Sequence, residues 1–145
     1  MNNIRRHQTV ITTENGRDIR LIYDEDADML DIFFDENEAA TGIELTDHIL
    51  VRLNRKTGRA VSLTLLHFSI LAEQTEFGPR SYPLDRLEEL PEDLRELLIR
   101  VLTAPPLSQF LKLSFFQESP TRRVPLIYVA QAPKSAIAGI GVCMD

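Results

Sequence analysis

Three aspartates in one short polar stretch carry the spacing of a cation-binding loop. Asp24, Asp26 and Asp28 occupy the first three carboxylate positions of an EF-hand calcium loop, and Asp35 falls at the twelfth position. The sixth position of such a loop needs glycine but holds Met29, and the flanking residues alternate as strands do. The sequence therefore argues against an EF-hand. A solvated turn between strands is the favoured interpretation, with a looser divalent-cation site as the alternative.

The other residue types that could do chemistry form no recognisable constellation. His7, His48 and His67 lack metal-ligand spacing, and we expect His67 to be a partly buried, hydrogen-bonded side chain. No serine lies in a nucleophile-elbow pattern, and the glycines form neither a phosphate loop nor a dinucleotide fingerprint. We therefore predict no catalytic residue, no cofactor-binding residue, no metal ligand and no cofactor, and we favour a protein that is not an enzyme.

The elements that must position these residues are mostly strands in the first half of the chain. Apolar and polar side chains alternate in four segments, which are residues 17–23, 29–34, 43–53 and 61–65. Asn15-Gly16 predicts a hairpin turn that pairs residues 8–13 back as an edge strand, and Asp47 marks a turn, bulge or break. The sequence therefore predicts an antiparallel β-meander whose alternating apolar residues, between Ile19 and Leu65, share one interior.

Helices are predicted after the strands. Closely spaced apolar side chains in residues 67–73 predict a short helix that covers one face of the sheet, and residues 84–90 predict another. Pro91 begins the main predicted helix, which ends before Pro105-Pro106. Its apolar stripe consists of Leu94, Leu97, Leu98, Val101 and Leu102. The predicted fold class is α+β, an antiparallel β-meander with helices packed on one face.

The C-terminal third is β-rich and ends in a small-residue tail. Residues 110–116 and 124–130 favour strands, and Pro125 makes the second an edge strand or an extended arm that docks on a partner. We expect residues 131–145 to be disordered unless a neighbouring subunit captures them. The prediction is a β-meander domain followed by a helix and β-rich extension packed on the same core, with the boundaries 1–76 and 77–145.

Composition and charge restrict the compartment and the partners. The formal net charge is -6 at pH 7, so we expect the chain to repel nucleic acid and anionic membranes. The sequence shows no signal-peptide core and no apolar run of membrane-spanning length. Cys143 is the single cysteine, which excludes an internal disulfide. These features predict a soluble, cytoplasmic protein.

Charges are segregated along the chain. Residues 21–48 contain ten acidic residues and no lysine or arginine, whereas residues 49–66 contain four basic residues and no acidic one. Opposite charges on adjacent antiparallel strands contribute about 0.2–1 kcal/mol per pair, so cross-strand matching is the favoured explanation. The alternative is an acidic face that meets a basic partner.

The acidic turn also opens a segment with a family resemblance. Tyr23-Asp24-Glu25-Asp26-Ala27-Asp28-Met29-Leu30-Asp31-Ile32 resembles the signature Tyr-Asp-x-x-Ala-Asp-x-Leu-x-Ile of a bacterial small-protein family of unknown function. Residues 46–51, Gly58 and residues 61–69 continue the likeness, which covers about residues 19–70. The resemblance implies a compact sheet with a short helix, and it implies no activity.

Three functional hypotheses follow. The first is a small non-catalytic interaction module that homo-oligomerises, with a dimer favoured, through the Leu94-to-Leu102 stripe or the Phe110-to-Phe116 strand. The second is an accessory or antitoxin-like protein that presents an acidic face to a basic partner. The third is a metal-dependent hydrolase or nuclease that uses the turn of Asp24, Asp26 and Asp28. We favour the first, with no nucleic-acid or membrane partner.

Overall fold

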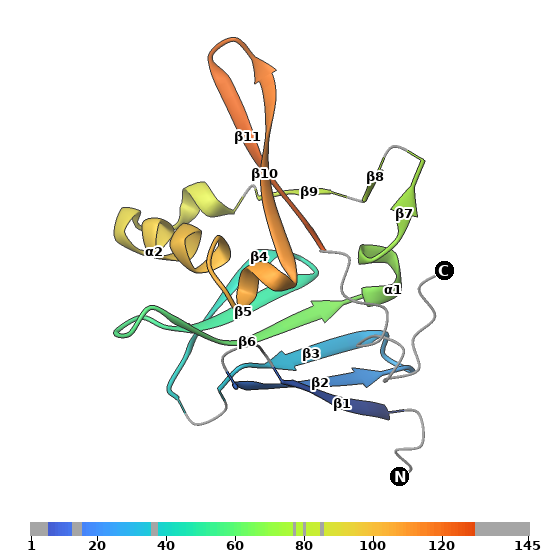
Figure 1. The fold of residues 1–145 in the computed structure, drawn as a ribbon. Coiled ribbons are helices and arrows are strands. Elements are labelled where there is room, and N and C mark those ends of the chain that lie inside the picture. Colours follow the sequence, from blue (N-terminus) through green and yellow to red (C-terminus); the bar gives the residue numbers. More distant parts are fainter. Residues whose placement is uncertain are drawn as a thin grey trace.

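The computed structural model is built mainly from antiparallel strands with few helices (Figure 1). It describes residues 6–12, 16–35, 38–76, 78–79, 81–84 and 86–129. The longer strands are β1 Arg6–Thr12, β2 Asp18–Asp24, β3 Met29–Phe33, β4 Thr41–Thr46, β5 Ile49–Asn54, β6 Arg59–Leu66, β10 Leu111–Ser119 and β11 Arg122–Val129. The short strands are β7 Gln74–Thr75, β8 Gly78–Pro79 and β9 Tyr82–Pro83, and the helical elements are α1 Phe68–Leu71, η1 Leu87–Glu89, α2 Glu92–Leu102 and η2 Leu107–Gln109. The predicted disordered tail, which includes Cys143, lies outside the described residues.

Six strands form the main sheet in the order β1-β2-β3-β6-β5-β4, and every neighbouring pair is antiparallel. The predicted meander is wrong at its middle, because β3 lies beside β6 and not beside β4. Burial explains the arrangement. β6 carries four successive buried residues, 60–63, and lies inside the sheet, whereas Gly42 and Glu44 of β4 are exposed at its edge. The chain therefore crosses from β3 to the far edge and returns through two hairpins.

One face of this sheet carries the core. The strand register aligns an apolar row that is almost fully buried, namely Ile43, Val51, Leu63, Ile32 and Leu21. The predicted shared interior between Ile19 and Leu65 is confirmed by one cluster that holds all these residues. Val61 is buried outside that cluster, because the β5–β6 register shifts around it. Asp47 lies in the turn between β4 and β5, where the alternation of side chains breaks.

The chain after β6 contributes to the same hydrophobic cluster. Four residues of α2 belong to it, namely Leu94, Leu98, Val101 and Leu102. Pro91 is the N-cap of α2, so the helix begins at Glu92, one residue later than the sequence predicts. The predicted turn at residues 84–90 is the 3-10 helix η1 with a buried Leu87. Most of the predicted apolar stripe is therefore enclosed within a single chain.

A second, three-stranded sheet has the order β10-β11-β9. β10 and β11 form a long hairpin that projects away from the main sheet (Figure 1). Across the described ranges, no helix has the length and apolar content needed to span a membrane.

Candidate functional site

The aspartate turn is held by its own hydrogen bonds. Residues 25–28 connect β2 to β3, and Asp24 Oδ1 accepts the backbone N–H groups of Asp26 (3.1 Å) and Ala27 (3.2 Å). This is the structural use that aspartate commonly has in a turn. Among the residues that the structure describes, no three His, Cys, Asp or Glu side chains are placed to hold one metal ion. The hydrogen bonds support the turn interpretation.

Asp28 ties this turn to the first helix. Its backbone is left-handed (φ 53°), a conformation that aspartate adopts more readily than most residues. Its carboxylate accepts the Tyr23 hydroxyl (2.8 Å), the Ser69 hydroxyl (2.6 Å) and the Ser69 backbone N–H (3.1 Å). Its carbonyl oxygen accepts the N–H of Phe68 (2.9 Å). These bonds join segments 41 residues apart, and we call them the Asp28 clamp.

The clamp fixes the protonation state of its members. Burial alone would raise the pKa of Asp28, but the hydrogen bonds from Ser69 and Tyr23 outweigh it and lower that pKa below its ordinary value. Burial and the bond to Asp28 raise the pKa of Tyr23 to about 12. The carboxylate is therefore ionised and the phenol neutral near pH 7. A carboxylate that already accepts three donors has little remaining capacity for a cation.

The segregated charges are matched in part within the chain. The guanidinium of Arg59 lies 3.6 Å from Asp35 Oδ2 and 3.5 Å from Glu38 Oε2. Both ion pairs join the basic block to the acidic block. Arg86 lies outside both blocks, and it donates to Glu44 (2.8 Å) and to Asp47. Exposed pairs of this kind contribute about 1 kcal/mol or less each. Their main effect is to reduce the negative charge that the acidic block presents.

Two histidines meet at the end of the sheet that holds the Asp28 clamp. His48 immediately precedes β5 and His67 immediately follows β6, and these strands pair with Ile49 opposite Leu65. The hairpin therefore brings the rings together, with Nδ1 atoms 3.0 Å apart and ring planes at 86°. His67 is hydrogen-bonded as expected, but the expectation that it is partly buried is wrong, because its side chain is exposed. Spacing along the sequence missed this pair, whereas the register of the hairpin identifies it.

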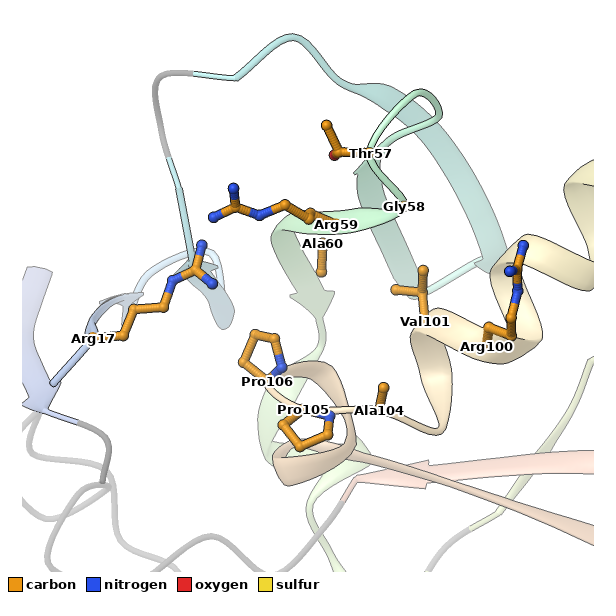
Figure 2. Close-up of a pocket in the computed structure, with 10 residues that line it drawn as sticks. All are labelled: Arg17, Thr57, Gly58, Arg59, Ala60, Arg100, Val101, Ala104, Pro105 and Pro106. Atoms are coloured by element: carbon orange, nitrogen blue, oxygen red, sulfur yellow. The ribbon is translucent and has the colours of Figure 1, made fainter. Parts of the chain in front are cut away.

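A cleft of about 290 Å³ lies between the β5–β6 loop and α2 (Figure 2). Three arginines from separate elements line it, and Figure 2 shows Arg17 and Arg59 extending toward each other while Arg100 stands apart on α2. Arg17 and Arg59 lie 3.9 and 3.6 Å from the same Oδ2 atom of Asp35. An anionic ligand would have to compete with that carboxylate, which makes the cleft a weak ligand site.

The β10–β11 hairpin, which we call the arm, extends beyond the core. At its base, three side chains are buried in the core cluster, namely those of Leu111, Ile127 and Val129. Among the described strands, β9 pairs with β11 at Leu126 and Ile127, and the outer half of the arm consists of β10 and β11. Figure 1 shows this outer half standing clear of the rest of the molecule.

Pro125 shows how the arm accommodates proline within a strand. It lies opposite Phe115, and its carbonyl oxygen accepts the N–H of Leu84 (3.0 Å), which follows β9. The nitrogen and oxygen of one strand residue point to the same side, so the missing N–H faces away from β10 and removes no bond from the hairpin. Phe115 consequently directs its own N–H and C=O toward the outer edge of β10.

Apolar side chains lie on both faces of the outer arm. Phe115 is 50% exposed and Phe116 is 55% exposed, and neighbours in a strand point to opposite faces. Phe115 lies opposite Pro125 on one face, and Phe116 lies opposite Val124 on the other. The guanidinium of Arg123 sits 4.5 Å from the ring centroid of Phe115. Among the described residues, both rings therefore lie outside the core cluster.

Comparison with known proteins finds one family, and it covers part of the chain. Residues 20–69 match the family described as Protein of unknown function (DUF2283). Neither the curated proteins nor the solved structures gave a match. The matched segment includes the Asp28 clamp and the histidine pair, whereas the arm lies beyond it. This segment is therefore similar to an uncharacterised protein family, which supports the resemblance found in its sequence.

Proposed function

We propose that this chain is a small non-catalytic interaction module that forms a homodimer through the outer half of the arm. The observation that carries the proposal is the exposure of Phe115 and Phe116 on opposite faces of a projecting hairpin. Full burial of one phenylalanine side chain contributes about 1.5–3 kcal/mol. Pairing at the β10 edge would cover part of this area through cross-strand contacts between the two copies, which contribute about 0.2–1 kcal/mol per pair.

The outer edge of β10 gives a second copy a defined way to bind. No other described strand lies on that side of β10. An exposed apolar edge offers unpaired N–H and C=O groups to an added strand. Antiparallel pairing of β10 with the β10 of a second copy obeys a two-fold axis, the commonest symmetry of small oligomers. Such pairing would use the outward groups of Phe115 and join two hairpins into one sheet.

The alternative hypotheses receive less support from the geometry. Arg59 and Arg86 engage part of the acidic block, which weakens the case for a basic partner. A metal-dependent hydrolase at the aspartate turn would have to break the Asp28 clamp. The Leu94-to-Leu102 stripe is largely enclosed in the core, which makes the arm the better surface for a second copy. The net charge of -6 favours a protein partner over nucleic acid.

Sedimentation equilibrium of the full chain tests the proposal. At high micromolar concentration we expect twice the 16.5 kDa mass of one chain. The double variant Phe115→Ser with Phe116→Ser removes both rings and should return the mass to that of one chain. Val10→Ser is the matched control, because Val10 is 52% exposed on β1 away from the arm, and it should remain dimeric.

A second pair of variants separates strand pairing from ring packing. Phe115→Ser keeps the outward N–H, whereas Phe115→Pro removes it without removing a bond between β10 and β11. Strand pairing requires the proline variant to associate more weakly than the serine variant. A wild-type chain that is monomeric at every concentration, or a double variant that is still dimeric, would overturn the proposal.

A further inference from the structure

We propose that His48 and His67 form a binding site for a divalent transition-metal ion such as Ni²⁺, Cu²⁺ or Zn²⁺. The proposal rests on the 3.0 Å separation of their Nδ1 atoms at the end of the β5–β6 hairpin. Imidazole nitrogen is a preferred ligand of all three ions. The site is independent of the arm and of the dimer.

The separation of the two nitrogens suits a shared ion. With metal–nitrogen bonds of about 2.0–2.1 Å, nitrogens this close subtend an angle of roughly 91–97° at the metal. That angle fits neighbouring positions of a square-planar or octahedral ion, which favours Ni²⁺ and Cu²⁺ over tetrahedral Zn²⁺. Small adjustments about the broad χ2 torsion of each histidine would aim the two lone pairs at the ion.

Both histidines are held in place by their backbones. The carbonyl oxygen of His48 accepts the N–H of Leu66 (2.8 Å), and the N–H of His48 donates to Thr46 Oγ1 (3.0 Å). His67 has a left-handed backbone (φ 56°), which few residues with side chains adopt. Its carbonyl oxygen accepts the N–H of Leu71 (3.1 Å) in α1. This left-handed residue makes the connection between β6 and α1.

The surroundings leave room for further ligands. Two hollows of about 210 and 250 Å³ adjoin the pair, and both are lined by His48 and Tyr82. One water needs about 30 Å³, so several waters can complete the coordination of an ion held by two side chains. Because the chain supplies two imidazoles there, we expect a modest affinity and a site that binds a metal reversibly.

The nearby charges favour a cation. Asp47 lines one of the hollows and directly precedes His48, and the carboxylate of Asp28 is bonded to Ser69, two residues after His67. Arg86 is the opposing charge, and it is engaged by Glu44 and Asp47.

Isothermal titration calorimetry with NiCl₂ tests the site in the full chain. All proteins carry Cys143→Ser, so that the single thiol supplies no ligand. We expect one ion per chain, with affinity reduced at least about tenfold in His48→Gln and in His67→Asn. Asparagine is chosen at position 67 because it tolerates the left-handed backbone. His7→Gln is the matched control, since His7 pairs with Glu25 away from the site, and its affinity should be unchanged.

Electron paramagnetic resonance of bound Cu²⁺ identifies the ligands of the ion, which a change in stability alone does not alter. Hyperfine coupling to two imidazole nitrogens is expected in the parent protein and to one in each single variant. Circular dichroism shows whether each variant keeps its fold. The inference is overturned if the parent binds no Ni²⁺, if both variants bind as tightly as the parent, or if His7→Gln loses as much affinity as they do.

Discussion

At the scale of single residues, the role of a polar side chain depends on partners that lie far from it in the sequence. The spacing of Asp24, Asp26 and Asp28 predicted a polar turn correctly, because turn preference is a local property. Whether a carboxylate there binds an ion or a hydroxyl depends on Ser69, which lies 41 residues from Asp28. The pairing of His48 with His67 was missed for the same reason, since it depends on strand register.

Replacement of Asp28 tests the clamp through the pH dependence of stability. Its pKa is lower in the folded chain than its ordinary value, so its contribution is fully present above that ordinary value and is lost as the pH falls through the folded one. Asp28→Asn keeps a residue that tolerates the left-handed backbone but removes the charge. We expect Asp28→Asn to lower the unfolding free energy by about 1 kcal/mol at pH 7, a figure already discounted for solvent screening, and by less once the pH has fallen through the lowered pKa of Asp28.

Urea denaturation at a series of pH values measures this difference. The control is Asp26→Asn in the same turn, because Asp26 lies outside the clamp and its backbone N–H, which the substitution keeps, donates to Asp24 Oδ1. A pH-independent gap between wild type and Asp28→Asn would show that the charge of the clamp contributes nothing.

At the scale of elements, local periodicity predicts which segments are strands but not how they are arranged. The alternation in β2, β3, β5 and β6 follows from burial of one face, and it located these strands to within a few residues. No local pattern in the sequence predicts that β3 lies beside β6. This pairing places Ile32 opposite Leu63, and a long stretch of chain separates them. Pro125 predicted an edge strand or an extended arm, but β11 is the central strand of its sheet, because β9 pairs with it at Leu126 and Ile127.

The β5–β6 loop offers a test of how an element is joined to α2. Gly58 has a positive φ of 72°, and a Cβ there would lie 3.3 Å from Leu97 Cδ1. Gly58→Ala should therefore lower the unfolding free energy by about 1–2 kcal/mol, through backbone strain and a tight contact. Thermal unfolding measures the effect. Gly42→Ala is the control, because its φ is not positive and its nearest contact is an ordinary 3.6 Å, so a loss as large as that of Gly58→Ala would contradict the explanation.

At the scale of the whole molecule, the sheet keeps one apolar face for its own core and the arm carries apolar side chains away from it. The core cluster draws on β2 to β6, α2 and the base of the arm, so one chain already encloses most of its large apolar residues. Phe115 and Phe116 are exceptions that lie together at one place. Sequence could indicate a β-rich C-terminal segment there, but only the three-dimensional arrangement shows which of its side chains remain outside the core.

Amide hydrogen exchange of the full chain at low and high protein concentration tests dimerisation through the arm most directly. The N–H groups of Leu113 and Phe115 share the strand side that faces the outer edge of β10. If two copies pair at this edge, both amides exchange at least about tenfold more slowly when the protein is concentrated, while amides at the free edge of β4 do not change. Exchange at Leu113 and Phe115 that is equally fast at both concentrations would contradict the account.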